Sequence, residues 1–246
     1  MSNPTAAILI IGNEILSGRT QDTNVNFIAR KLSTIGISLM EVRFIPDQEA
    51  IIIDSARSLA QRYDYLFTTG GIGATHDDIT AASIAKAFNR HLIRDETIVQ
   101  ILESHYQDRL NETRLRMAMV PEGSELISNP VSGAPGFQVE NVFCLAGIPT
   151  VMQAMFEGII PKLHTGTPYY TKTVKSSVLE NDIAQDLACI QQKFTQVEIG
   201  SYPSFLAPGK FGVSLVVRGT DLSIIDQATD AIYHMIINRG HTAGIE

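Results

Sequence analysis

Residues 67–80 have the sequence Phe-Thr-Thr-Gly-Gly-Ile-Gly-Ala-Thr-His-Asp-Asp-Ile-Thr. The run before them, from Tyr63 to Phe67, is short, aromatic and apolar, which is typical of a buried strand. After them, apolar residues recur at the spacing of one helix face: Ala81, Ile84, Ala85 and Phe88. The stretch therefore predicts a strand, a glycine loop and a helix, which Asp78 or Thr80 could cap.

The three glycines of this loop favour contact with an anion. Gly70, Gly71 and Gly73 can adopt positive φ, and the N–H groups of such a loop can converge on a phosphate. Asp77 and Asp78 follow closely. Two carboxylates beside a polyanion are favourable only if a cation lies between them or one of them acts as a base. The pattern indicates phosphate chemistry with a metal.

A simpler interpretation of the loop stays open. Glycines after a strand often form only a turn, and an aspartate before a helix often only caps it. The loop lacks both the Gly-Lys-Ser/Thr of a Walker motif and the Gly-x-Gly-x-x-Gly dinucleotide fingerprint. Generic motifs therefore do not assign it.

The flanking sequence alternates between strand and helix patterns. Apolar runs predict strands at 6–11, 37–45 and 142–145, and residues 121–137 have the composition of a long irregular loop. Helical spacing is found in four segments, with apolar positions near 25–35, 52–59, 98–102 and 151–159. Such an order predicts a doubly wound α/β fold with a mostly parallel sheet and right-handed crossovers.

Polar residues follow the first three predicted strands. Asn13 and Glu14 follow the first, Asp47 follows the second, and the 70–78 loop follows the third. Because ligands of such sheets bind outside the carboxyl ends of the strands, we expect these groups to converge. Asp47 is also placed to cap the next helix.

The second part of the chain predicts a small α+β domain. A composition rich in Lys, His, Thr, Gly and Pro marks a linker at 161–168. Beyond it the patterns predict a βαββα order with strands at 171–178, 197–199 and 211–217, and with a loop at 201–210. The predicted domains are 1–165 and 169–246.

Composition narrows the class of protein. The 246 residues carry a net charge of −7, and Lys and Arg are not clustered, so we expect no nucleic-acid partner. Arg109, Arg114 and Arg116 either reach a phosphate or form a solvated face. Cys144 and Cys189 match no metal or redox spacing and predict buried thiols. No apolar run is long enough to span a bilayer, and a cytoplasmic location is predicted.

The motifs resemble the molybdopterin-binding domain family, and within it the competence/damage-inducible protein A branch. The resemblance covers residues 1 to about 165, and the deamidase domain of longer members is absent from this sequence. Its motifs are Gly12-Asn-Glu-Ile-Leu-Ser-Gly18, Asp22-Thr-Asn24, Arg43-Phe-Ile-Pro-Asp47, the 68–80 loop, Asn129–Phe137 and Ala146–Pro149. Val151 departs from the pattern, because glutamate is frequent there and could ligate a metal.

The resemblance implies a three-layer fold that binds a pterin or nucleotide pyrophosphate, as a homo-oligomer (dimer or trimer). The activity that it implies is metal-dependent hydrolysis of ADP-ribose or a related dinucleotide. Two alternatives remain: adenylyl transfer to molybdopterin in molybdenum cofactor biosynthesis, and a non-catalytic pterin- or nucleotide-binding module.

Specific residues follow from these expectations. Asp78, Asp47 and Asp77 are the predicted catalytic residues, with His76 as an alternative to Asp77 for orienting water. A divalent cation, Mg²⁺ or similar, is predicted on Asp78, Asp47 and Glu14. The predicted phosphate or nucleotide contacts are Thr69, Gly70, Gly71, Gly73, Thr75, Asn13, Gly136 and Gly147.

Overall fold

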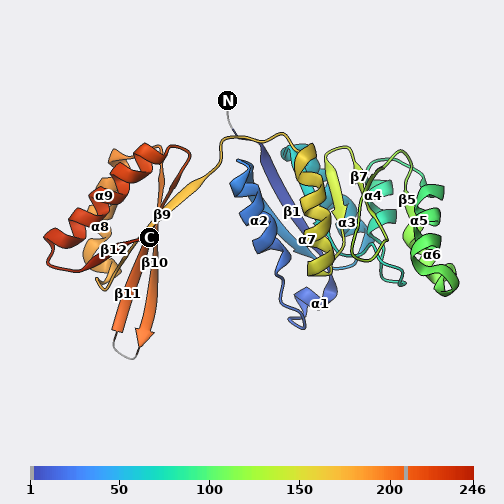
Figure 1. Ribbon diagram of the computed structural model, residues 1–246, viewed down its shortest axis with the longest axis horizontal. Coiled ribbons are helices and arrows are strands. Elements are labelled where there is room, and N and C mark those ends of the chain that lie inside the picture. Colours follow the sequence, from blue (N-terminus) through green and yellow to red (C-terminus); the bar gives the residue numbers. More distant parts are fainter. Residues whose placement is uncertain (1–2, 208–209) are drawn as a thin grey trace. The chain divides into compact units, whose positions relative to one another are not determined.

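A computed structural model describes residues 3–207 and 210–246 of the chain (Figure 1). The chain divides into two compact units, Met1–Gly166 and Thr167–Glu246. The junction lies within the linker that the sequence predicts at 161–168. Among the described residues, no helix combines the length and apolarity needed to cross a bilayer.

In the part of unit 1 that the structure describes, the central sheet has six strands in the order β2-β1-β3-β8-β7-β6. Strands β2, β1, β3 and β8 are parallel, β7 is antiparallel to β8, and β6 is antiparallel to β7. The bounds are β1 Thr5–Ile11, β2 Ser38–Ile45, β3 Tyr65–Thr69, β6 Glu125–Ile127, β7 Gly136–Val139 and β8 Val142–Leu145. The predicted mostly parallel sheet is confirmed.

Helices cover both faces of this sheet. On one face, α2 (Asn24–Thr34) and α7 (Pro149–Ile159) pack over a buried cluster that includes Ile28, Met152 and Phe156 (Figure 1). On the other face lie α3 (Glu49–Arg62), α4 (Thr80–Ala87) and α5 (Glu96–Tyr106), over a cluster that includes Leu59 and Ile84. Both faces of β1, β3 and β8 are therefore buried, which explains their continuous apolar runs. The three-layer architecture is confirmed.

Several short elements complete unit 1. A two-stranded antiparallel sheet pairs β4 (Leu92–Arg94) with β5 (Met119–Pro121). The others are α1 (Asn13–Leu16), η1 (Gln107–Arg109), α6 (Glu112–Leu115), η2 (Arg116–Ala118) and η3 (Ile160–Lys162). The prediction of one irregular loop over 121–137 is wrong, because β6 lies inside it and β7 begins at Gly136. Apolar stretches of three residues are too short to show a strand period.

In the part of unit 2 that the structure describes, an antiparallel sheet packs with two helices. Strand order is β10-β11-β9-β12, over a core that includes Val174, Leu215 and Ile232. The elements are β9 (Tyr170–Ser176), α8 (Glu180–Lys193), β10 (Glu198–Ala207), β11 (Lys210–Gly219), α9 (Leu222–Asn238) and β12 (Ala243–Ile245). The α+β class is confirmed. The loop predicted at 201–210 is wrong over 201–207, which belong to β10, and residues 208–209 lie outside the described residues.

The two cysteines differ from each other. Cys144 is fully buried in β8, and burial raises the pKa of its thiol to about 12. Cys189 is exposed on α8, so the prediction that both thiols are buried is wrong for Cys189. A helix of 14 residues with one fully buried apolar position leaves most of its surface to solvent.

Candidate functional site

The carboxyl ends of four parallel strands meet at one edge of the sheet. In the strand register, Ile11 at the end of β1 pairs with Ile45 of β2, and Thr69 of β3 pairs with Leu145 of β8. Ile10 also pairs with Thr69, which joins the two halves. The loops that follow β2, β1, β3 and β8 therefore leave the sheet side by side. This register is the reason to expect that the polar groups of these loops converge at one edge of the sheet.

The order of the strands reverses at this point. From β1 the chain passes to β2 on one side, and it then returns across β1 to β3 on the other side. In doubly wound sheets, such a reversal opens a crevice outside the carboxyl ends of the two strands, where ligands bind. The glycine loop after β3 borders this crevice.

Gly70 and Gly71 shape the start of this loop. Both have positive φ, +100° and +68°. A Cβ atom on Gly70 would lie 2.2 Å from the Ile11 carbonyl oxygen, so only glycine allows β1 and the loop to approach so closely. The buried Thr80 holds the loop in place through two hydrogen bonds. Its hydroxyl donates to the Gly70 carbonyl oxygen at 3.0 Å, and its N–H donates to the Gly71 carbonyl oxygen at 3.0 Å.

Asp78 closes the end of the same loop. Its Oδ2 accepts hydrogen bonds from the Thr75 N–H at 2.7 Å and from the Thr75 hydroxyl at 2.6 Å. The predicted cap of α4 by Asp78 or Thr80 is wrong, because the N-cap residue is Ile79 and no side chain bonds there. The Asp78 carboxylate accepts its hydrogen bonds from Thr75, three residues earlier, and therefore does not accept from the first N–H groups of α4. Among the described residues, Oδ1 of Asp78 accepts no hydrogen bond.

Asp77 and His76 lie on the outer side of the turn. Their side chains are 64% and 94% exposed, and the nearest approach of Nδ1 to Oδ1 is 3.9 Å. The polar Thr75 side chain beside it lowers the pKa of Asp77, with smaller contributions from the Asp77 backbone, His76 and Arg116. Asp77 is therefore ionised at neutral pH and suited to bind or orient groups, whereas its low basicity makes it a weak general base.

Asp47 joins the loops that follow β1 and β2. Its Oδ2 accepts a hydrogen bond from the Asn13 N–H at 2.8 Å, and beside it the Gly12 N–H donates to the Ile45 carbonyl oxygen at 3.1 Å. The alternative that Asp47 caps α3 is wrong, because Gln48 is the N-cap residue and makes no side-chain bond. The side chain of Glu14 is exposed and folds back onto Gly12, where an added Cβ would lie 2.6 Å from Glu14 Oε1.

A buried amide at the start of α2 contacts the loop after β8. Asn24 is 4% exposed, and its Nδ2 donates to the Gly147 carbonyl oxygen at 2.9 Å. Asn24 Oδ1 is buried without a hydrogen-bond partner among the described residues, which is a costly arrangement unless a ligand or water donates to it. Gly147 itself is exposed and packs against Gly70, since an added Cβ would lie 3.3 Å from the Gly70 Cα.

Two other predicted contact residues are buried. Thr69 is 1% exposed in β3. Gly136 is buried in β7, where an added Cβ would lie 2.3 Å from the Cys144 carbonyl oxygen. Both residues are buried in strands of the central sheet, so in this structure they support the loops of the site and are not exposed to a ligand. Val151, in the first turn of α7, is likewise buried in the core.

A pocket of about 240 Å³ adjoins the glycine loop on the α4 side of the sheet. Its polar lining comes from Gly71, Gly73, Asp78 and Arg116. The rest of the lining is mainly apolar: Ile72, Ile79, Ala81, Ala82, Leu92, Met117, Met119, Val120, Pro135 and Phe137. This mixture suits one aromatic ring system that carries an anionic group. Asn13, Glu14, Asp47 and Gly147 do not line it.

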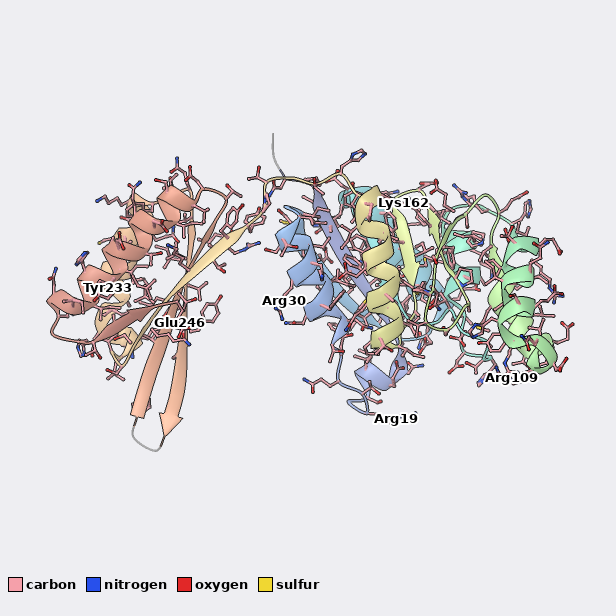
Figure 2. The ribbon with its side chains drawn as sticks, in the orientation of Figure 1. Arg19, Arg30, Arg109, Lys162, Tyr233 and Glu246 are labelled. Atoms are coloured by element: carbon pink, nitrogen blue, oxygen red, sulfur yellow. The ribbon has the colours of Figure 1, made fainter. Side chains whose placement is uncertain are left out.

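Two arginines supply positive charge near this edge. Arg116, in η2, is exposed at the pocket and forms no ion pair or hydrogen bond with any described residue. Figure 2 shows Arg19 at the end of unit 1 that carries α1, and it too has no such partner in the described part of the chain. The sequence suggested Arg116 only as one of three candidates, and Arg19 had no distinguishing signal.

The carboxylates do not form a complete metal site by themselves. Among the described residues, no group of three or more His, Cys, Asp or Glu side chains is placed to hold a metal ion. Glu14, Asp47 and Asp78, which the sequence predicted to share a cation, are therefore not gathered in this structure. Their oxygens are hard ligands, and Mg²⁺ is commonly held by one or two carboxylates together with substrate phosphates and water.

The family comparisons cover both units. The family described as "Probable molybdopterin binding domain" matches residues 7–165. The family described as "FAD synthase, middle domain" matches residues 168–241. The first match covers more than half of the chain and includes every loop of the carboxyl edge.

Individual relatives agree with these matches. A protein of Archaeoglobus fulgidus is 39% identical over 196 residues, which are 80% of this chain and 84% of that protein. A CinA-like protein of Fervidobacterium nodosum is 31% identical over 74% of this chain and 46% of its own length. The crystal structure of CinA from Thermoplasma acidophilum, a protein described as of unknown function, superposes with a TM-score of 0.61 at 31% identity. That superposition covers 64% of this chain and 98% of the other. The chain thus belongs to the molybdopterin-binding domain family, in its CinA-like branch.

Proposed function

We propose that unit 1 hydrolyses a nucleotide pyrophosphate of the ADP-ribose type with the help of a divalent cation. The observation that carries the proposal is the position of Asp78, which lines the pocket next to Gly71, Gly73 and Arg116. An apolar pocket with a carboxylate and an unpaired guanidinium at its mouth suits a ring joined to a diphosphate.

The chain's own residues would act on the diphosphate as follows. Arg116 neutralises phosphate oxygens, and the N–H groups of Gly71 and Gly73 orient them. The Gly70 N–H, which the sequence also predicted to contact phosphate, instead donates to the Leu145 carbonyl oxygen at 3.2 Å. Asp78 and Asp47 each keep one carboxylate oxygen without a hydrogen bond among the described residues, and these oxygens would hold the cation. When bound, the cation supplies positive charge against the diphosphate and makes water a better nucleophile.

The reaction requires no redox partner. A water oxygen forms a bond to one phosphorus, and the bond from that phosphorus to the bridging oxygen breaks. The leaving phosphate takes the electron pair, and the water proton passes to a phosphate oxygen or to solvent. Asp77, ionised and exposed beside Asp78, would orient the water through its carboxylate rather than remove its proton.

The test is product analysis with ADP-ribose and MgCl₂. We expect AMP and ribose 5-phosphate in equal amounts, a loss of turnover with EDTA, and a loss with Asp78→Asn, which keeps an oxygen to accept from Thr75. Asp182→Asn, the same charge change on α8 of unit 2, is the matched control and should leave turnover unchanged. Full turnover by Asp78→Asn, or in EDTA, would contradict the proposal.

A second candidate function is binding of a pterin or nucleotide without turnover, and its molybdopterin form could include adenylyl transfer. The match to a molybdopterin-binding family favours it, as does the lack of a three-ligand metal group among the described residues. It predicts a rise in stability of about 2.7 kcal/mol at a ligand concentration 100 times Kd, with no product. Adenylyl transfer would instead require ATP consumption that depends on a pterin acceptor.

A further inference from the structure

Strand β2 leaves one edge of the central sheet open. Among the described residues it pairs with β1 alone, so the peptide groups on the outer side of residues 41–45 have no strand partner. Natural proteins usually protect such an edge with Lys, Pro or a very short strand. β2 has eight residues, Ser-Leu-Met-Glu-Val-Arg-Phe-Ile, and contains neither Lys nor Pro. Its charged residues, Glu41 and Arg43, and a bulge at Met40 limit the strands that can pair with this edge to those with complementary charges.

Apolar side chains are exposed along this edge. Met40 is 61% exposed and Phe44 is 43% exposed, although both lie in the strand. At the carboxyl end of β2, α1 adds Leu16, which is 51% exposed. Solvent exposure of three large apolar side chains along one edge is unfavourable for an isolated chain and favours contact with another surface.

Charged side chains occupy the opposite face of the same strand. The Glu41 carboxylate accepts from Arg43 Nε at 2.6 Å, from the Tyr63 hydroxyl at 2.9 Å and from Arg62 at 3.3 Å. A bulge lies where Ala6 pairs with Leu39 and Ala7 with Glu41, so the register is regular from Glu41 to Ile45. This regular stretch fixes which side chains can face a neighbouring strand.

The sequence around Val42 is self-complementary. In an antiparallel pair about a two-fold axis at Val42, Glu41 of each copy lies directly opposite Arg43 of the other. One position further out, Phe44 of one copy lies next to Met40, the bulge residue, of the other. Directly opposed side chains in such a pair lie close enough to interact, and opposite charges and apolar pairs are favourable there. A two-fold interface needs this property, since each copy presents the same surface.

We propose that two copies of this chain pair through β2, antiparallel about Val42, to form one continuous sheet across the dimer. Each edge then gains hydrogen bonds, the apolar side chains cover one another, and two Glu41–Arg43 contacts form between copies. The carboxyl edges of the two sheets point in opposite directions, so each copy keeps its own candidate site. The proposal is independent of the proposed hydrolysis.

Charge reversal gives a direct test by native mass spectrometry and sedimentation. Arg43→Glu places the new carboxylate opposite Glu41 twice, and Glu41→Arg places two guanidinium groups opposite each other twice. We expect the wild-type chain to be a dimer and the dissociation constant of each single variant to rise about tenfold or more. A mixture of the two variants restores opposite charges at every contact, so it should form heterodimers, detected with an affinity tag on one copy.

Control variants separate pairing from general effects of charge. Arg94→Glu disrupts a surface pair with Glu112 at 3.1 Å, away from β2, and should leave the dimer intact. If a single variant fails to fold by circular dichroism, the double variant Glu41→Arg/Arg43→Glu is measured instead and should dimerise. A monomeric wild-type chain, single variants that dimerise as tightly as wild type, or a mixture without heterodimers would overturn the proposal.

Discussion

Two aspartates at the carboxyl edge accept backbone hydrogen bonds of nearly equal length, yet they connect different parts of the chain. Asp78 accepts from Thr75, three residues away, within one turn of the glycine loop. Asp47 accepts from Asn13, which is 34 residues away and follows another strand. One carboxylate therefore shapes a loop, whereas the other joins two strands of the sheet.

The difference separates a binding role from a supporting one. Asp78 lines the pocket with Gly71 and Gly73, and Asp47 does not. We infer that the loop after β3 contacts the reacting groups of the substrate most directly. The loops after β1 and β2 hold the edge of the sheet together and can add one oxygen ligand. Four predictions test this comparison.

The largest effect is expected at Gly70, where the two regions touch. Gly70→Ala places a Cβ atom 2.2 Å from the Ile11 carbonyl oxygen at φ +100°, so we expect a loss of about 3 kcal/mol or more in unfolding free energy. Gly18→Ala is the control, because Gly18 has φ +72° but open space around it, and should cost about 1 kcal/mol. Urea denaturation measures both, and equal losses would contradict the close approach.

The second prediction concerns turnover. Asp78→Asn should lower kcat for ADP-ribose about 100-fold or more, since a charge beside the diphosphate is lost. Asp47→Asn should lower it only about tenfold, because Asp47 lies outside the pocket and the amide keeps an oxygen that can still ligate the cation. Steady-state kinetics at saturating Mg²⁺ measures both variants. The reverse order would place the reaction over β1 and β2 instead.

The third prediction concerns stability. Asp47→Ala should cost about 1 kcal/mol, because the Asn13 N–H loses its partner and the tie between β1 and β2 is lost. Asp78→Ala should cost less, because a bond across three residues can also form in the unfolded chain. Thermal unfolding without ligand gives both values, and a larger loss for Asp78→Ala would remove the distinction.

The smallest effect concerns Asp77. Its folded pKa is lowered, so its contribution to stability is present at neutral pH and is lost as the pH falls below the usual carboxyl value through the folded pKa. Thr75→Val removes the largest cause of this shift and should move the pKa up towards its ordinary value. Titration by NMR measures the change, and an unchanged midpoint would show that Thr75 is not its cause.

The sequence predicted the architecture because long apolar strands and glycine turns are local signals. The runs that became β1, β3 and β8, together with the loop at 70–78, located the carboxyl edge. Short elements such as β4, β6 and β12, each three residues long, carry no period that could be recognised.

The internal geometry of the site could not be predicted from the sequence, because it depends on which of several possible hydrogen-bond partners each polar group binds in the folded chain. An aspartate before a helix is a normal cap, yet Asp78 met Thr75 and Asp47 met Asn13 instead. Arg116 reaches the pocket from a 3-10 turn that no pattern marks, and Asn24 is positioned by Gly147, 123 residues away. The contacts of Asp47, Arg116 and Asn24 exist only after the sheet has formed.

The central claim is that the diphosphate lies on the loop after β3. The most direct test is an NMR titration of ¹⁵N-labelled protein with the α,β-methylene analogue of ADP-ribose, which cannot be hydrolysed at the bridge, in the presence of Mg²⁺. We expect the largest amide shifts at Gly71, Gly73 and Thr75, with smaller shifts at Asn13. Saturable binding that leaves these amides unchanged and shifts residues elsewhere would contradict it.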